Sequence, residues 1–82
     1  MKLVYFASLR ERIGKNEEER DPPAHVRSIA ELIDWLSAQD EIYAGAFANG
    51  VFRAAIDRRH VKPEAAIKGA REIAFFPPMT GG

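Results

Sequence analysis

The residues with the clearest chemical potential stand at the end of the chain. The sequence closes on A-F-F-P-P-M-T-G-G, in which Pro77-Pro78 separate an apolar run from a segment that ends at Gly81-Gly82. Two prolines favour an extended backbone, so they project the last residues away from the preceding strand as a stiff spacer. Because glycine has no Cβ, such an end can enter a channel too narrow for side chains and bring its carboxylate to a reaction centre in another protein.

The carboxylate of Gly82 is the group that this tail would deliver. A carboxylate is a poor electrophile, but its attack on the α-phosphate of ATP gives an acyl adenylate that a sulfur or amine nucleophile can attack. We expect Gly82 to be the reactive terminus and Thr80 and Gly81 to pass through the channel. The residues expected to dock on a partner are Phe75, Phe76, Pro77, Pro78 and Met79. The alternative is an idle end, since glycine-rich termini are commonly disordered.

Other motifs give weaker signals. His25 and His60 stand apart from other metal-ligating residues, so we expect surface residues rather than metal ligands. The acidic run at residues 17–19 lacks the ligand spacing of a calcium loop. The basic cluster R-R-H-V-K at residues 58–62 has no interleaved aromatic residues, which argues against nucleic-acid binding. We therefore expect no metal, no bound cofactor, no nucleic-acid partner and no catalysis by the chain on its own.

Composition places the chain among small globular proteins. Its 82 residues suffice for one domain with one core. The 12 basic and 12 acidic side chains cancel, so no overall field attracts nucleic acid or an anionic membrane. The absence of cysteine excludes a disulfide framework, a thiolate metal site and a thiol nucleophile. No apolar run approaches the roughly 20 residues of a membrane helix, and we expect a cytoplasmic protein.

The elements that must position the tail can be placed from periodicity. Residues 2–6 and 72–76 are apolar at both alternating positions, which predicts two strands in the middle of a sheet. A capping box at Ser28 followed by apolar residues at helical spacing predicts the main helix at 28–38. Residues 16–21 are polar enough for a loop by propensity, and a solvated edge strand is the alternative. The remaining expected elements are a capping box at Ser8 with a short helix ending at Gly14, a turn at Asn49-Gly50, a strand at 51–56, a polar turn at 57–60, a short strand at Val61 and a helical turn at 63–67. Residues 40–48 give no clear pattern.

This order of elements predicts an α+β fold, the β-grasp or ubiquitin-like arrangement, with a mixed sheet of about five strands and one main helix. We expect residues 1–76 to form the domain and residues 77–82 to form an extended tail. One helix covers one face of a sheet, whereas both faces of the terminal strands are apolar. The other face therefore either exposes apolar surface to a protein partner or is covered by the short helix and loops, and the sequence leaves both possibilities open.

Both ends of the chain carry a family resemblance. The closing A-F-F-P-P-M-T-G-G (74–82) and the opening V-Y-F-A-S-L-R-E-R-I-G (4–14) resemble the small subunits of molybdopterin synthase, a family of ubiquitin-like sulfur carriers. A-A-I-D at 54–57 falls where that family has a hydrophobic strand ending in Asn, here replaced by Asp57. K-G-A-R-E at 68–72 stands where relatives carry Gly-Asp-Glu, so we expect an altered turn before the last strand.

The resemblance implies a mechanism and partners. An adenylating enzyme similar to those that activate ubiquitin would use ATP to adenylate Gly82, and sulfur would convert the adenylate to a thiocarboxylate. The tail would insert into the large synthase subunit, where sulfur passes to cyclic pyranopterin monophosphate in molybdenum cofactor biosynthesis. Two large and two small subunits are implied. The alternatives are a sulfur carrier of the thiamine thiazole type, against which F-F-P-P argues, a protein modifier joined to lysines, and a plain interaction domain.

Overall fold

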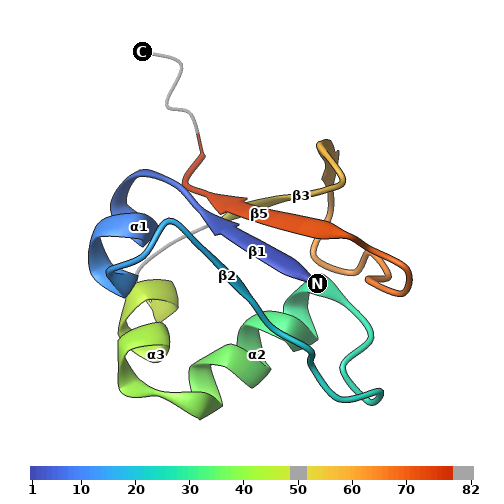
Figure 1. Ribbon diagram of the computed structural model, residues 1–82, viewed down its shortest axis with the longest axis horizontal. Helices are drawn as coiled ribbons and strands as arrows, with labels where there is room; N and C mark the ends of the chain where they lie inside the picture. Colours follow the sequence, from blue (N-terminus) through green and yellow to red (C-terminus); the bar gives the residue numbers. More distant parts are fainter. Residues whose placement is uncertain (49–51, 79–82) are drawn as a thin grey trace.

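The computed structural model describes residues 1–48 and 52–78 of the chain. Within these residues, five strands form one mixed sheet, and three helices lie together on one side of it (Figure 1). The elements are β1 (Lys2–Tyr5), α1 (Ala7–Ile13), β2 (Glu17–Glu19), α2 (Ile29–Gln39), α3 (Glu41–Ala48), β3 (Arg53–Ile56), β4 (Arg59–Val61) and β5 (Glu72–Phe76). The strand order across the sheet is β2-β1-β5-β3-β4.

The two terminal strands lie side by side in the middle of the sheet. β1 runs parallel to β5, with Leu3 opposite Ile73 and Tyr5 opposite Phe75. β3 pairs antiparallel with the other side of β5. β2 and β4 are the edge strands and each pairs antiparallel with its one neighbour. This arrangement confirms the predicted β-grasp fold, and it places the strand that leads into the tail between two paired neighbours.

The core lies between the sheet and the helices. The residues of β1 and β5 that face the helices are almost completely buried, and one contiguous cluster joins them to all three helices. Burying a side chain of this size stabilises the fold by about 1.5–3 kcal/mol. The cluster includes Leu3, Tyr5, Ile73 and Phe75 from the sheet, Leu9 and Ile13 from α1, Ile29, Leu32 and Leu36 from α2, and Tyr43, Ala46 and Phe47 from α3.

The capping box predicted for α2 is confirmed. Ser28 is the N-cap residue, and its Oγ accepts a hydrogen bond from the backbone N–H of Glu31 at 3.1 Å. Glu31 in turn accepts from the backbone N–H of Arg27 at 2.7 Å, so the side chain reaches back past the cap. The bond to Ser28 pairs an amide that the first helical turn leaves without an intrahelical partner, and the bond from Arg27 fixes the chain just before the cap. The helix ends at Gln39 because Asp40 is extended, with φ −160° and ψ 143°.

Helix α1 begins earlier than the sequence predicted. The N-cap is Phe6, and no side chain caps the helix, so the capping box expected at Ser8 is wrong. Leu9 and Ile13 bury the inner face of the helix in the core, and this burial substitutes for a cap. The predicted end at Gly14 is confirmed, since Gly14 has φ +85° and its N–H donates to the carbonyl of Arg10.

Two other segments differ from the prediction. Residues 41–48, which gave no pattern, form α3, in which Tyr43, Ala46 and Phe47 make a buried stripe at helical spacing. Gly45 lowers the helix propensity, and Ala44 and Ala48 make the outer face as apolar as the inner one, which obscures the periodicity. The helical turn expected at 63–67 is replaced by a tight turn at Pro63 and Glu64, in which the N–H of Ala65 donates to the carbonyl of Lys62 at 3.0 Å. Ala66 then forms an isolated bridge with Ser28, so the helix does not continue.

A tight hairpin connects β3 to β4. Its two turn residues, Asp57 and Arg58, both have positive φ, at 48° and 70°, as a two-residue type I′ turn requires. The carboxylate of Asp57 also accepts hydrogen bonds from the backbone N–H groups of Arg71 and Glu72, both at 3.0 Å. Asp57 therefore ties the hairpin to the first residue of β5, while His60, expected in the turn, belongs to β4.

Candidate functional site

The predicted tail begins where β5 leaves the sheet. Pro77 and Pro78 follow the strand directly and are half-buried (Figure 1). The backbone N–H of Phe6 donates to the carbonyl of Phe75 at 3.1 Å, which extends the pairing of β1 with β5 up to the start of the tail. We call Phe76, Pro77 and Pro78 the tail root. Met79, Thr80, Gly81 and Gly82, to which the sequence assigned docking, threading and the reactive carboxylate, lie outside the described residues.

The two phenylalanines at the end of β5 occupy different environments. Phe75 is 0% exposed; its ring stacks on Tyr5 at a centroid distance of 6.2 Å and meets Phe47 edge-on at 5.4 Å. Phe76 points to the opposite side of the sheet, is half-buried, and packs against His60 at 5.2 Å. Of the two phenylalanines among the five residues predicted to dock, only Phe76 therefore has a ring that a partner could reach. Phe75 can act on docking only indirectly, by fixing the strand.

The side of the sheet that faces away from the helices carries apolar side chains, of which Phe6 is exposed, Val4, Ala74 and Phe76 are half-buried and Ala55 is buried. Val4, Ala74 and Ala55 are direct neighbours across three strands, since Ala74 pairs with both of the others. With Phe6 and Phe76 they line a shallow hollow of about 340 Å³, which Arg58 and Glu72 border. We call these five apolar residues the open sheet face. Of the two possibilities that the sequence left, the structure favours exposure, because the described helices all lie on the other side (Figure 1).

The open sheet face has the features of a protein-docking surface. Phe6 is 46% exposed, an unusual position for a large aromatic side chain unless a partner covers it. Phe76 is shared with the tail root, so the apolar surface runs without a break to the place where the tail departs. Lys2 lies at one border, where its Nζ is 3.5 Å from Glu17 and 3.8 Å from Glu72. An apolar centre with a charged border is typical of protein interfaces.

The acidic run of β2 contains a half-buried carboxylate that the sequence analysis missed. Glu18 accepts hydrogen bonds from the hydroxyl groups of Tyr43 at 2.6 Å and Tyr5 at 2.8 Å. Arg20 and Lys15 also donate to it, at 3.1 and 3.2 Å. Burial alone would raise the pKa of Glu18, but these four hydrogen bonds outweigh it and lower the pKa to about 2. Glu18 is thus an ionised anchor that holds β2 to β1 and α3 rather than a cation ligand.

The described residues offer few groups for chemistry of their own. In the ranges 1–48 and 52–78, no three or more His, Cys, Asp or Glu side chains gather where they could hold a metal ion. His25 and His60 are both exposed, as expected from the sequence. Nor does this part of the chain contain a helix long and apolar enough to cross a membrane. The arrangement is suited to docking and to presenting a tail.

Solved structures of other proteins share this fold. A superposition with SAMP1 from Haloferax volcanii covers 100% of this chain and 98% of that one, with a TM-score of 0.73 at 19% sequence identity. A putative molybdopterin converting factor, subunit 1, from Pyrococcus furiosus superposes over 95% of both chains, with a TM-score of 0.74 at 26% identity. Both similarities extend over nearly the whole domain, so the ubiquitin-like fold is established.

Sequence comparison identifies relatives along the full length. Molybdopterin synthase sulfur carrier subunits are 32% identical in Escherichia coli and 34% identical in Haemophilus influenzae, over 100% of this chain and 99% of each relative. The corresponding subunit of Chlamydomonas reinhardtii is 33% identical over 100% of this chain and 98% of its own length. The model of the ThiS family matches residues 3–82, which include the open sheet face and the whole tail. This chain therefore belongs to the ThiS family, and its similarity to molybdopterin synthase sulfur carrier subunits extends from end to end.

Proposed function

We propose that this chain is the sulfur carrier subunit of a molybdopterin synthase and that the carboxylate of Gly82 carries the sulfur. The observation that carries the proposal is the continuity of the open sheet face with the tail root, on a chain whose full-length relatives are named as such subunits. A partner that covers Phe6 and Phe76 is positioned to receive the residues that follow Pro78. The chain acts as a donor subunit, and catalysis belongs to its partners.

The chemistry takes place in two activation steps and one transfer. In the first step an oxygen of the Gly82 carboxylate attacks the α-phosphate of ATP, and pyrophosphate leaves. In the second, sulfur at the oxidation level of hydrosulfide attacks the acyl carbon; the C–O bond to AMP breaks, AMP leaves, and a thiocarboxylate remains. In the large synthase subunit this sulfur passes to cyclic pyranopterin monophosphate. The carrier binds neither ATP nor the pterin by itself; the adenylating enzyme and the large subunit do so.

The structural contribution of this chain is to deliver the carboxylate in a defined direction. β5 is paired on both sides, and Phe75 is locked into the core, so the tail root has a fixed position. Because the tail root is fixed, less conformational entropy is lost when the tail enters a partner. The fixed tail root also helps to bring the acyl carbon of Gly82 close to its nucleophile. Glycines at the end add no Cβ that would crowd the acyl carbon.

The intact mass of the protein, purified from cells that contain its adenylating enzyme, tests the proposal. We expect a mass increase equal to the replacement of one oxygen by sulfur, located on Gly82 by fragmentation. A variant with one extra residue after Gly82 serves as the control and should remain unmodified, because its glycine carboxylate is part of a peptide bond. An unmodified wild-type mass in the presence of a competent activating enzyme would count against the proposal.

The same measurement distinguishes a sulfur carrier from a protein modifier, whereas the pathway that receives the sulfur must be identified by transfer to the pterin in the large subunit. A ladder of covalent adducts on other proteins would indicate a protein modifier, because conjugation links Gly82 to lysine as an amide. Gly81→Val keeps the carboxylate but adds a branched side chain to the tail. We expect this variant to lose most of its activation, and full activation would argue that the tail does not thread a narrow channel.

A further inference from the structure

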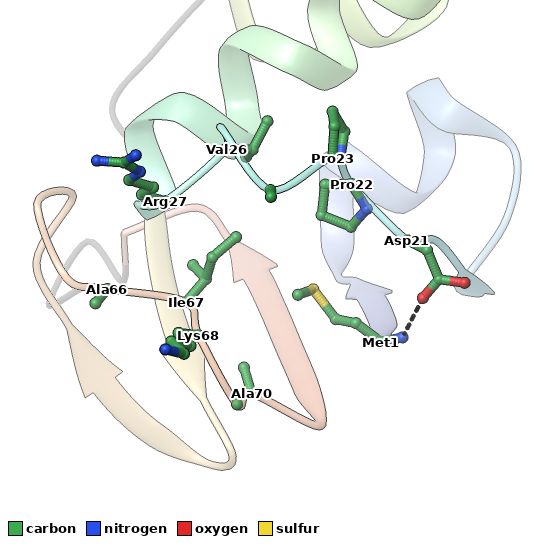
Figure 2. A pocket seen from close by; sticks show the side chains of 12 residues that line it. Met1, Asp21, Pro22, Pro23, Val26, Arg27, Ala66, Ile67, Lys68 and Ala70 are labelled. Carbon is green, nitrogen blue, oxygen red and sulfur yellow. Dashed lines mark hydrogen bonds and ion pairs between the residues drawn. The ribbon is translucent and has the colours of Figure 1, made fainter.

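A second hollow lies at the end of the sheet where β1 and β5 begin. It has a volume of about 600 Å³, within the range of pockets that bind small molecules. Residues 21–27 form one wall and residues 66–70 the other, with Met1 between them (Figure 2). We call it the N-terminal pocket. The five-residue strand β5, roughly 15 Å long, separates it from the tail root.

The inside of the N-terminal pocket is mainly apolar. Met1 and Ile67 extend into the space from opposite sides, and Pro22 closes its upper part (Figure 2). Val26 and Ile67 are themselves core residues, exposed by 7% and 4%, so part of the lining is the edge of the hydrophobic core. A ligand with an apolar body would remove this surface from water.

The charges around the pocket are asymmetric. Asp21 lies on one side, where it and Glu19 accept hydrogen bonds from the N-terminal ammonium at 3.3 and 3.1 Å; the bonds to Glu19 and Asp21 raise the pKa of this amine. Arg27 and Lys68 lie on the other side (Figure 2). Within the described part of the chain, neither cation takes part in an ion pair. Glu31 lies beside Arg27, since its carboxylate accepts from the backbone N–H of that residue at 2.7 Å. The positive charge that no carboxylate pairs with on this side therefore comes from Lys68.

From this combination we infer that the N-terminal pocket binds a small organic carboxylate with an aromatic or branched apolar body. The body would lie against Met1 and Ile67, and the carboxylate would face Lys68. The N-terminal pocket shares no lining residue with the hollow of the open sheet face. A ligand in the pocket therefore leaves that face accessible, and this inference does not depend on the proposed function.

Titration of the full chain with phenylbutyrate, followed in two-dimensional amide NMR spectra, tests the inference. We expect shifts confined to residues 24–27 and 66–70, with a dissociation constant on the order of 1 mM for a probe of this size. Phenylbutanol and phenylbutylamine keep the apolar body and change only the charge of the head group. The alcohol should bind about two- to fivefold more weakly than the carboxylate, as expected for losing a solvent-exposed ion pair, and the amine more weakly still.

Charge variants distinguish the pocket from unspecific binding. Lys68→Gln should weaken phenylbutyrate about two- to fivefold and leave phenylbutanol unchanged. Lys62→Gln is the matched control, since Lys62 is an exposed lysine that does not line the pocket, and it should change neither affinity. Ala70→Leu should fill the pocket and weaken both probes. If Ala70→Leu does not fold, the affinity of Lys68→Gln for phenylbutyrate still tests the inference, because Lys68 is exposed and its replacement should not affect folding.

Three results would overturn the inference. Equal affinity for all three probes would remove the preference for an anion. Shifts centred on Val4, Ala55 and Ala74 would place the ligand on the open sheet face instead. The absence of any shift at a probe concentration of about 10 mM, tenfold above the expected dissociation constant, would mean that the pocket does not bind this class of ligand.

Discussion

Replacing Glu18 by glutamine tests whether the half-buried carboxylate of β2 anchors that strand. The wild-type side chain is only 12% exposed and accepts hydrogen bonds from Tyr5, Tyr43, Arg20 and Lys15. Glutamine keeps the shape and one acceptor oxygen but removes the negative charge. The two cationic donors then lose their ion-pair partner, and hydrogen bonds to a charged acceptor become weaker neutral ones.

The pKa of Glu18 gives the magnitude of the effect. Its value of about 2 in the folded protein lies below the ordinary value of 4.5. At about 1.4 kcal/mol for each pKa unit, this difference favours the folded state by about 3 kcal/mol at neutral pH. Because the folded-state pKa is the lower one, this stability is present above the ordinary value of 4.5 and is lost as the pH falls towards 2. We therefore expect Glu18→Gln to cost about 2–3 kcal/mol at pH 7 and less than about 1 kcal/mol at pH 2.5.

Urea unfolding at both pH values measures this difference. Trp35, the one tryptophan of the chain, is half-buried with the guanidinium of Arg20 5.9 Å from its ring centre, so its fluorescence should report unfolding. With a slope of about 1 kcal/mol per molar urea, the midpoint at pH 7 should fall by about 2–3 M. Glu17→Gln is the matched control: Glu17 is 53% exposed on the other side of β2, and its loss should cost less than about 1 kcal/mol. Equal costs for the two variants, or a cost for Glu18→Gln that does not change with pH, would refute the reasoning.

Three further predictions concern the hairpin and the end of β5. Arg58→Gly should raise the free energy of unfolding by about 1 kcal/mol, because Arg58 has φ 70°; an unchanged or lower urea midpoint would contradict this. Asp57→Ala should lower the free energy of unfolding by about 1–3 kcal/mol, because two backbone amides lose their acceptor. Asp57→Asn keeps an acceptor oxygen and should be more stable than Asp57→Ala in the same assay. Phe76→Ala should leave the domain folded yet weaken binding of the large synthase subunit at least tenfold, as measured by calorimetry. Phe75→Ala should instead cost about 3–5 kcal/mol of stability. Unchanged binding by Phe76→Ala would exclude the Phe76 ring from the interface.

The sequence was sufficient to predict the elements whose signals are local. The central strands follow from runs of apolar residues, α2 from the capping box at Ser28, and the end of α1 from Gly14; all are confirmed. The role of Glu18 could not be predicted, because its partner Tyr43 is 25 residues away and belongs to a helix that gave no periodic pattern. The available signal was the alternation of side chains along β2. Glu18 pairs with Leu3, whose side chain faces the core, so the middle glutamate of the strand lies on the core side.

The candidate site could likewise be predicted from the sequence only in part. Its position at the end of β5 could be predicted, because the prolines mark the end of the strand. Which phenylalanine faces a partner could not be predicted from composition, because both positions are equally apolar and only the pairing register decides between the two faces. The register of β5 with β1 assigns Phe75 to the core and Phe76 to the open sheet face.

Strand β5 thus joins folding and tail presentation in one element. Its inward residues, Ile73 and Phe75, are fully buried, and its outward residues, Ala74 and Phe76, belong to the open sheet face. Because the strand is paired on both sides, moving the tail root would require breaking the best-packed part of the domain. A partner that docks on the open sheet face therefore meets a tail whose starting point does not shift. For the same reason, loss of activity in a Phe75 variant cannot be separated from loss of folding, and a substitution at Phe76 is the one that isolates recognition.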